Sequence, residues 1–597
     1  MDPRIIRAKL DTLRRRSTRR RWPIAGWEAR TADHYAPHQY RYDGEWAPVI
    51  GESWWPAGKT VFLRAQAQTP ADVALDALYL TFDGEGWEGL LSIDGRPYAG
   101  IDANHTRVQP PHLGDLALEV EFVALLRVLC EPSLAGERAR LRQVRFEEID
   151  AEVEAAWYDL RFAWEAAEAA HDERRRQRLH DALEEALLAI DLTLADERFH
   201  EEVKAARRLL RSRVERIAPD AEAGHIFLTG HTHIDTAWLW PLRETVRKCG
   251  RTFSTACRLM EKYPEYRFTC SQPQLYAYTK EHYPTLYQEI KRWVREGRWE
   301  ATGGMWVEAD CNISSGEALI RQILFGLRFY REEFGVRPRT CWLPDVFGYP
   351  TTLPTILQGC GIPFFYTNKL HWQARNPFPH HLFWWEGIDG ARVLAHIPRL
   401  KSYYNGQPTP QEIQIAWDNF NEKRLYDEVM LPFGYGDGGG GPTEEMLEYA
   451  RRAGRYPGLP ACRQGLEEAY FDRVMAAAPD LPIWRGELYL ETHRGTFTTQ
   501  AAVKRANRRA ELLLREAEII GVLANLAGAT IDLDALRPAW QNLLLLQFHD
   551  ILPGSSIGEV YTEALHDYAQ IIGVGERTRD QALHWIAQQA PVADLLV

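Results

Sequence analysis

The stretch GHIFLTGHTHIDTAWLWPLRET, residues 224–245, decides how the middle of the chain is interpreted. Ile226 to Leu228 form a short apolar run between Gly224 and Gly230, which predicts a buried strand. Two histidines and an aspartate follow at once. In α/β sheets and barrels, ligands and catalytic groups gather at the carboxyl ends of the strands. The pattern therefore predicts a functional site where this strand ends.

The composition excludes several classes of protein. The net charge of −12 argues against a general nucleic-acid binder. No apolar stretch is long enough to cross a bilayer, and none follows the basic N-terminus as a signal peptide would require. The eight cysteines include no Cys-x-x-Cys pair, so a reduced, cytoplasmic setting fits best. We interpret the arginines at 14–16 and 19–21 as a solvated face or an oligomer contact.

The order of the patterns predicts a multidomain α/β chain, because 597 residues are too many for one hydrophobic core. Short alternating runs between Gly and Pro turns predict a β-sandwich-like domain over residues 1–145. Helical periodicity over 146–220 predicts a connecting segment that packs against the next domain. Alternating strands and helices over 221–485 predict a β/α barrel-like or parallel-sheet domain, and Ala- and Leu-rich helices over 486–597 predict a C-terminal bundle.

The first polar cluster is His231, His233 and Asp235. The spacing of His233 and Asp235 places both on the same side of an extended segment, where an imidazole and a carboxylate can converge on one divalent ion. Alternatively, the histidines cap the strand end and the aspartate caps the following helix. Both interpretations stay open on this cluster alone.

Two further clusters follow strand-like segments. Asp345 comes after RTCWLP, where Pro344 removes an N–H and Gly348 permits a sharp turn; an N-cap is the alternative role. Asp437 lies in the glycine-rich stretch LPFGYGDGGGGPTEEM. This stretch lacks both a Gly-Lys-Ser/Thr ending and a Gly-x-Gly-x-x-Gly turn at a helix start, which argues against nucleotide binding. The glycines instead indicate close approach of the backbone to a bulky polar ligand.

A fourth cluster ends an apolar helix, LLLLQFHDILPGSS. His549 and Asp550 stand at its end, and Pro553 and Gly554 stop it. Burying such a pair is costly unless it has a partner, and a metal ion or a sugar hydroxyl would be one. The alternative is a core histidine whose hydrogen bonds are satisfied by the protein.

Taken together, these clusters resemble the glycoside hydrolase family 38 α-mannosidases, in particular the branch of the cytosolic and vacuolar enzymes. The resemblance covers roughly residues 224–560 and rests on motifs in a fixed order: GHTHIDTAWLWP, SQPQLYAY, GGMWVEADCNISSGEALIRQ, WLPDVFGYPTTLP, TNKLHW, FGYGDGGGGPT, ELYLETHRGTFTTQ and HDILPGSS.

The resemblance implies a seven-stranded β/α catalytic domain followed by a three-helix middle domain. It also implies one divalent metal, zinc in most relatives and cobalt in some. Matched by position, the metal ligands would be His233, Asp235, Asp345 and His549. Asp345 would also be the nucleophile, and the substrate-binding residues would be Trp238, Lys369, Arg494 and Asp550.

The acid/base residue is less well defined by the resemblance, because branches of the family differ in the glycine-rich loop. Asp437 is our choice, since it is the one carboxylate inside that loop and a second carboxyl must face the nucleophile. The other candidates are Glu308, Asp310 and Glu491.

The expected activity is a retaining α-mannosidase that removes terminal α-linked mannose through a covalent mannosyl-enzyme, with the metal holding the mannose 2- and 3-hydroxyls. The alternatives are a mannosylglycerate hydrolase, a metal-dependent sugar deacetylase and a non-catalytic glycan-binding subunit. Relatives continue beyond the helical domain into β-sandwich domains, whereas this sequence stops at PVADLLV. A short form, a fragment, or a partner chain that supplies those domains would each account for this. A homo-oligomer is a separate expectation. No nucleic-acid or membrane partner is expected.

Overall fold

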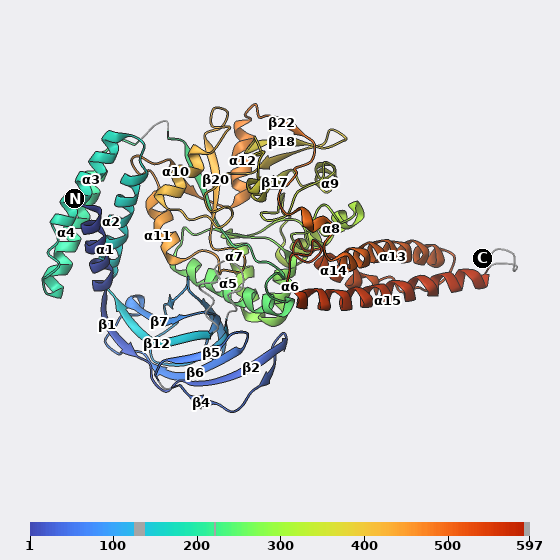
Figure 1. Cartoon of the computed structure of the whole chain (residues 1–597), viewed down its shortest axis with the longest axis horizontal. Helices are drawn as coiled ribbons and strands as arrows, with labels where there is room; N and C mark the ends of the chain where they lie inside the picture. The colour runs from blue at the N-terminus through green and yellow to red at the C-terminus, as the bar shows by residue number, and fades with distance from the viewer. Residues whose placement is uncertain (50, 125–137, 220–222, 590–597) are drawn as a thin grey trace.

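The computed structural model describes residues 1–49, 51–124, 138–219 and 223–589. The chain runs from a helix and two β-sheets through a helical layer and a β/α region into a three-helix bundle (Figure 1). A mixed α/β fold with several sheets and a helical C-terminal region, as predicted, is confirmed. Among the described helices, none combines the length and the apolar character needed to cross a bilayer. The seven described cysteines are free thiols, and Cys130 lies outside the described residues.

The N-terminal region contains two antiparallel sheets. The first has the order β1-β12-β7-β10, with β5 paired to β12: β1 (Thr18–Pro23), β12 (Arg138–Ile149), β7 (Leu78–Glu85), β10 (Arg107–Val108) and β5 (Ser53–Pro56). The second has the order β3-β2-β6-β11-β8-β9, with β4 paired to β2: β3 (Gln39–Tyr42), β2 (Glu28–Ala36), β6 (Thr60–Gln68), β11 (Asp115–Ala124), β8 (Trp87–Ile93), β9 (Arg96–Ile101) and β4 (Ala47–Pro48). A short 3₁₀ helix, η1 (Leu75–Ala77), precedes β7.

The two sheets share one hydrophobic core. Leu80 and Phe82 of β7 belong to the same buried cluster as Leu63 of β6 and Val120 of β11. The alternation of buried and exposed residues along β6 places every second side chain in that core.

The chain begins with helix α1 (Pro3–Arg16), which lies within the segment predicted to be β-rich. Ile6, Leu10 and Leu13 are buried on one face of α1, which packs against the helical layer instead of the sheets. The arginines of the basic run form ion pairs within the chain: Arg14 with Glu154, Arg16 with Asp196, Arg19 with Asp150, Arg20 with Glu148 and Arg21 with Glu147. Five of the six arginines of this run are therefore paired with acidic residues of their own chain while their side chains stay 21–54% exposed, and the oligomer contact stays a prediction.

The helical layer consists of α2 (Ala151–Ala169), α3 (Glu173–Leu188) and α4 (Asp196–Val214). Asp150 caps α2 by accepting from the backbone N–H groups of Glu152 and Val153. Helix α2 packs against α10 (Pro410–Asp418) and α11 (Glu444–Ala453) of the following region. The expected packing of this segment against the next domain is therefore present (Figure 1).

The strands of the central region form two five-stranded sheets. The first is parallel, in the order β15-β14-β13-β20 with β21 also paired to β13: β13 (His225–His231), β14 (Phe268–Cys270), β15 (Trp299–Ala301), β20 (Glu428–Phe433) and β21 (Ala461–Gln464). The second has the order β16-β17-β19-β18-β22, in which β18 runs antiparallel to β19: β16 (Thr340–Trp342), β17 (Phe364–Tyr366), β18 (Leu382–Glu386), β19 (Arg392–His396) and β22 (Ile483–Arg485).

Side chains, not ladder hydrogen bonds, connect these two sheets where they adjoin. The Glu467 carboxylate accepts from Thr302 Oγ1 (2.6 Å), just after β15, and from Thr340 Oγ1 (2.8 Å) on β16. At the other side, His396 Nε2 of β19 lies 3.3 Å from the backbone N of Met430 on β20. A single seven-stranded barrel is therefore not confirmed as one continuous hydrogen-bonded sheet among the described residues.

Helices connect and cover these strands: α5 (Leu242–Lys262), α6 (Pro273–His282), α7 (Pro284–Arg295), α8 (Gly316–Phe334), α9 (Leu353–Gly359), α10, α11, α12 (Glu467–Ala477) and the 3₁₀ helices η3 (Lys369–Trp372) and η4 (Arg494–Phe497). Helix α8 is the clearest case of local signals, because Ser315 caps its start and Gly335 ends it in the left-handed conformation at φ 71°.

The C-terminal bundle consists of α13 (Ala501–Leu526), α14 (Leu536–Leu546) and α15 (Gly558–Gln589), and it extends away from the rest of the molecule (Figure 1). Leu514 and Leu544 of the bundle share a buried cluster with Leu343 and Phe347, which flank Asp345. Because they share this core, the end of α14 lies next to the ends of strands in the central region.

Candidate active site

Four of the predicted metal ligands converge in one buried place. His233 and Asp235 follow β13, Asp345 follows β16, and His549 follows α14. Each of the four offers a ligand atom within 4.8 Å of the others, and all four side chains are buried. The first three follow the ends of strands in the two central sheets, whereas His549 follows a helix of the bundle.

Glu308 orients both histidines. Its carboxylate Oε2 lies 2.9 Å from His233 Nδ1, and its backbone carbonyl lies 2.9 Å from His549 Nδ1. A carbonyl only accepts, so His549 Nδ1 carries a proton, and Nε2 is the ring nitrogen that faces the other ligand candidates. Ser271 Oγ donates to the other oxygen of Glu308 at 2.6 Å and holds the carboxylate in place.

The donor set fits a divalent cation. His549 Nε2 is buried and has no hydrogen-bond partner among the described residues, yet it lies 3.4 Å from Asp235 Oδ1, 3.5 Å from Asp345 Oδ2 and 3.7 Å from Asp550 Oδ2. Ligands bound to one ion at about 2.1 Å stand roughly 3 to 4 Å apart. Imidazole nitrogens with carboxylate oxygens are ligands that zinc accepts. These side chains can therefore hold one such ion with little movement.

Asp345 is held as a carboxylate by a buried lysine. Lys369 Nζ, on η3, donates to Asp345 Oδ1 at 2.6 Å. Burial alone would raise the pKa of Asp345, but the positive charge of Lys369, with the charges of the neighbouring histidines, outweighs it and holds that pKa well below its usual range. The Lys369 ammonium also lies over the ring of Trp372, 4.3 Å from its centroid. Asp345 is thus ionised and oriented.

Asp437 lies on the glycine loop, residues 434–442, which follows β20. Tyr404 Oη donates to Asp437 Oδ1 at 2.8 Å. Burial raises the pKa of Asp437 to about 6, and the charges of Asp235 and Asp345 add to that effect. A carboxyl group of this kind can hold a proton near neutral pH, beside a second carboxyl group that stays ionised.

The backbone of the glycine loop is built for close approach to its surroundings. Gly438 N donates to the carbonyl of His233 at 3.1 Å, and Gly436 N donates to Asn405 Oδ1 at 2.5 Å. A Cβ at Gly436 would stand 2.5 Å from Asn405 Oδ1 and 3.2 Å from His233 Cβ. The loop therefore has to be glycine-rich in order to lie against the first metal-ligand candidate.

Comparison with known proteins places this site in a family. The family profile "Glycosyl hydrolases family 38 N-terminal domain" matches residues 223–487, and "Alpha mannosidase middle domain" matches residues 491–586. The chain belongs to glycoside hydrolase family 38. The resemblance inferred from the ordered motifs is confirmed.

Curated members of family 38 resemble the chain over different lengths. Alpha-mannosidase 2C1 of Homo sapiens is 35% identical over 92% of this chain and 54% of its own length. Alpha-mannosidase G of Dictyostelium discoideum is 43% identical over 58% of this chain and 32% of its own length. The Alpha-mannosidase of Saccharomyces cerevisiae is 39% identical over 56% of this chain and 32% of its own length. The matched part thus covers about half the length of the human relative and about a third of the length of each of the other two.

A solved family 38 relative shares the fold. The crystal structure of an alpha-mannosidase from Enterococcus faecalis superimposes with a TM-score of 0.54 at 18% identity, and the match covers 61% of this chain and 43% of that one.

The other three predicted substrate-binding residues, Trp238, Asp550 and Arg494, have different surroundings from one another. Trp238 is half-buried, three residues beyond Asp235, and its backbone carbonyl accepts from Ile557 N at 2.9 Å. Asp550 is buried and accepts a hydrogen bond from Ser555 Oγ. Arg494 is exposed and donates to the carbonyl of Glu491 at 2.8 Å. Among the described residues, Arg494 makes no hydrogen bond or ion pair with the four ligand candidates, so its role in the pocket stays a prediction.

The alternative acid/base candidates have other contacts. Glu308 lies behind the two histidines, as described above. Asp310 is buried and accepts from Asn312 N (3.1 Å) and Ile313 N (2.6 Å), as in a turn. Glu491 accepts from Arg375 N at 2.7 Å, and this hydrogen bond lowers its pKa. These contacts favour structural roles for all three and leave Asp437 as the best-placed acid.

Two groups of site residues were missed by reasoning from sequence. Tyr404 and Asn405 contact Asp437 and Gly436 from a loop that carries no charged motif, and only its Tyr-Tyr-Asn-Gly turn could have drawn attention to it. His493 packs on Phe347 with ring centroids 4.9 Å apart. It directly precedes Arg494 in the motif ETHRGTFTTQ, in which Arg494 was the residue predicted to bind substrate.

Proposed function

We propose that this chain is a retaining α-mannosidase that releases terminal α-linked mannose from oligosaccharides or small mannosides. It would use one divalent metal ion, zinc, with cobalt as the alternative. The observation that carries the proposal is the pairing of two different carboxyl groups. Asp345, a member of the four-ligand group, is kept ionised by Lys369, while Asp437, which is close enough to Asp235 and Asp345 to be affected by their charges, has a pKa raised to about 6. The names of the relatives supply the substrate class.

The two carboxyl groups divide the reaction into two steps. First, an oxygen of Asp345 attacks the anomeric carbon of mannose while Asp437 gives its proton to the glycosidic oxygen, and the bond between that carbon and the leaving group breaks. Second, Asp437 removes a proton from water, the water oxygen attacks the same carbon, and the bond to Asp345 breaks. Two inversions leave the product in the starting α configuration.

The surrounding residues prepare both groups. Lys369 keeps Asp345 unprotonated and aims one of its oxygens, and Tyr404 orients Asp437. Trp238 and Asp550 would contact the sugar ring and its hydroxyls. A bound divalent ion, held by His233, Asp235, Asp345 and His549, would supply a Lewis-acidic template for the neighbouring 2- and 3-hydroxyls of mannose.

A trapping experiment tests the proposal. The metal-loaded chain is treated with 5-fluoro mannosyl fluoride, which should slow the second step and label Asp345 in the peptide CWLPDVFGYP, residues 341–350. NMR of an aryl α-mannoside reaction, recorded before mutarotation, should show α-mannose first. A label on another carboxylate, or β-mannose as the first product, contradicts the retaining mechanism.

The same assay separates the alternative functions. Acetate release from an acetylated sugar without mannose release would indicate a deacetylase, and binding without turnover would indicate a glycan-binding subunit. Faster turnover of mannosylglycerate than of oligomannosides would identify that substrate. The cytoplasmic setting, the homo-oligomer and the partner chain stay predictions; light scattering and an assay of the chain alone address the last two.

A further inference from the structure

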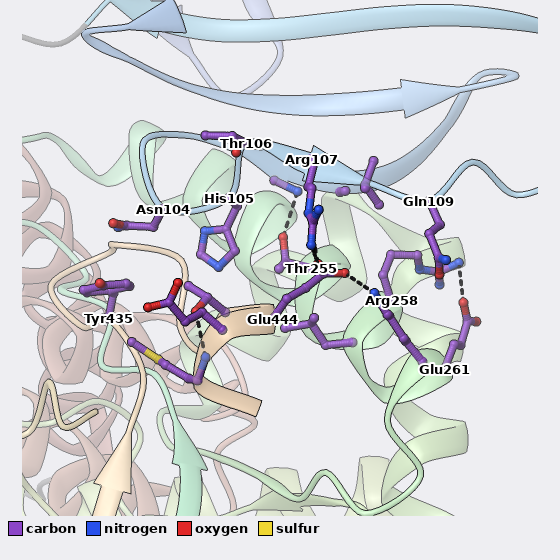
Figure 2. Close-up of a pocket in the computed structure, with 18 of the residues that line it drawn as sticks. Asn104, His105, Thr106, Arg107, Gln109, Thr255, Arg258, Glu261, Tyr435 and Glu444 are labelled. Atoms are coloured by element: carbon purple, nitrogen blue, oxygen red, sulfur yellow. Dashed lines mark hydrogen bonds and ion pairs between the residues drawn. The ribbon is translucent and has the colours of Figure 1, made fainter. Parts of the chain in front are cut away.

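A turn of the N-terminal β region touches the glycine loop. This turn, residues 102–105, joins β9 to β10. His105 Nε2 lies 3.0 Å from the carbonyl of Pro442, and Asn104 Nδ2 donates to the carbonyl of Gly439 at 3.4 Å. Figure 2 shows Asn104, His105 and Tyr435 together at one end of the cavity of about 880 Å³ that separates the two regions. The loop that carries Asp437 is therefore bordered by a different domain.

Both nitrogens of His105 face acceptors. Nε2 meets a backbone carbonyl, and Nδ1 lies 3.1 and 3.2 Å from the two oxygens of Asp102. Since neither a carbonyl nor a carboxylate can donate, both ring nitrogens carry protons and the ring is an imidazolium. Burial lowers the pKa of His105, but the charge of Asp102 and the two hydrogen bonds outweigh it and raise that pKa above its usual value. The hydrogen bond to Pro442 is therefore charge-assisted.

The same turn packs against the glycines directly. A Cβ at Gly440 would stand 2.7 Å from His105 Cε1 and 3.1 Å from Asp102 Oδ2. A Cβ at Gly438 would stand 2.7 Å from Cδ of Lys248, a residue of α5 that forms an ion pair at 2.6 Å with Glu88 of β8. The N-terminal region thus packs directly against Gly440 and is linked to Gly438 through Lys248.

The loop needs such support because of its backbone. Asp437 itself has φ 53°, and Gly438, Gly440 and Gly441 have φ 81°, 95° and 76°. A non-glycine residue is strained in this region, and glycines lose the most conformational freedom when they become ordered. The inner side of the loop is fixed by the hydrogen bond from Gly438 N to His233 O. On the outer side, His105 contacts the Pro442 carbonyl at 3.0 Å and Asn104 contacts the Gly439 carbonyl at the longer distance of 3.4 Å.

We propose that His105 is a positioning residue. Through its contact with the Pro442 carbonyl it holds the glycine loop against the residues that follow β13, and so keeps Asp437 at the glycosidic oxygen. The N-terminal β region then contributes a positioning residue to the active site. This inference rests on the proposed role of Asp437, and the experiment below separates the failure of one from the failure of the other.

The kinetic test compares two substrates in matched variants. His105→Ala should lower kcat/KM about 10- to 100-fold for an alkyl α-mannoside, which needs a proton on its leaving group, and much less for a dinitrophenyl α-mannoside. His105→Gln keeps an N–H that can reach Pro442 and should recover part of the loss. The control is His112→Ala, because His112 forms a similar pair with Asp94 at 2.9 Å on the same domain but is exposed and borders a different turn.

Amide hydrogen exchange gives a second measurement that needs no turnover. Peptides that cover residues 434–442 should exchange faster in His105→Ala than in the wild type and the His112→Ala variant, with circular dichroism unchanged. If wild type hydrolyses no α-mannoside, the proposed function fails, and the exchange result still decides whether His105 holds the loop. Unchanged exchange overturns the inference. Faster exchange with an equal loss on both substrates also overturns it, because the loop would then not act through Asp437. If His105→Ala does not fold, His105→Gln and Asp102→Asn are measured in its place, with smaller shifts of the same sign expected.

Discussion

Lys369 Nζ lies 2.6 Å from Asp345 Oδ1, and both side chains are less than a tenth exposed. The charges are thus removed from water, where their attraction is weakly screened. Lys369 follows β17 and Asp345 follows β16, so two neighbouring parallel strands present the ion pair at the same edge of the sheet.

Removing the lysine should disable the nucleophile. We expect Lys369→Met to lower kcat/KM by about 100-fold or more, because Asp345 loses the cation that keeps it ionised and aimed. Steady-state kinetics with an aryl α-mannoside measure this. Lys401→Met is the control, since Lys401 is exposed and pairs with the neutral Gln411. Activity within twofold of wild type in Lys369→Met would contradict the role of Lys369.

Chelation should abolish hydrolysis, and zinc or cobalt should restore it. The reason is the convergence of His233, Asp235, Asp345 and His549. The carboxylates of Asp235 and Asp345, together with that of Asp550, lie around His549 Nε2. Dialysis followed by elemental analysis and re-addition of each metal measures the dependence. Full turnover by protein shown to contain no metal would refute a catalytic ion.

Glu308 should tune metal affinity without touching the sugar. Glu308→Gln weakens the contact with His233 Nδ1, and we expect the affinity for zinc to fall about 10- to 100-fold. A competition titration with a chromophoric chelator gives the constant. Glu422→Gln is the matched control, because Glu422 is also a buried carboxylate but accepts from the backbone N–H groups of His381 and Leu382. Equal affinities in the two variants would argue against an orienting role.

The pH profile should report the protonation of Asp437. This group must carry its proton in the first step, and its pKa is raised to about 6 by burial and by the charges of Asp235 and Asp345. As the pH rises through that value the proton is lost, so kcat/KM for an alkyl α-mannoside should fall on the alkaline side. Asp437→Ala should remove this limb, and azide should rescue its turnover of a dinitrophenyl α-mannoside. An identical alkaline limb in Asp437→Ala would assign it to another group.

Tyr404 should shift that same limb. Its hydroxyl donates to Asp437 Oδ1 and favours the charged carboxylate, which lowers the pKa of Asp437. We expect Tyr404→Phe to move the alkaline limb to higher pH and to lower kcat severalfold. Tyr403→Phe is the control, because the Tyr403 hydroxyl makes no hydrogen bond in the described part of the chain. A limb that stays in place in Tyr404→Phe would mean that this hydrogen bond is lost in the substrate complex.

Local sequence signals determined the elements and the chemistry they carry. The apolar run after Gly224 predicted β13, and its polar end predicted the site of His233 and Asp235. Ser315 caps the start of α8, and Gly335 ends the helix. Such signals act within one or two turns of backbone, so a single sequence contains them. The order of the motifs then identified the family.

Only the tertiary structure decided which distant groups meet. His549 and Glu308 are 241 residues apart, and they are hydrogen-bonded because the bundle and the central region share one core. The two central sheets are linked by side-chain hydrogen bonds of Glu467 and His396, between strands that are far apart in the sequence. The contact of His105 with Pro442 likewise joins two domains. These contacts depend on how separately folded surfaces pack together, and no local pattern of residues encodes that packing.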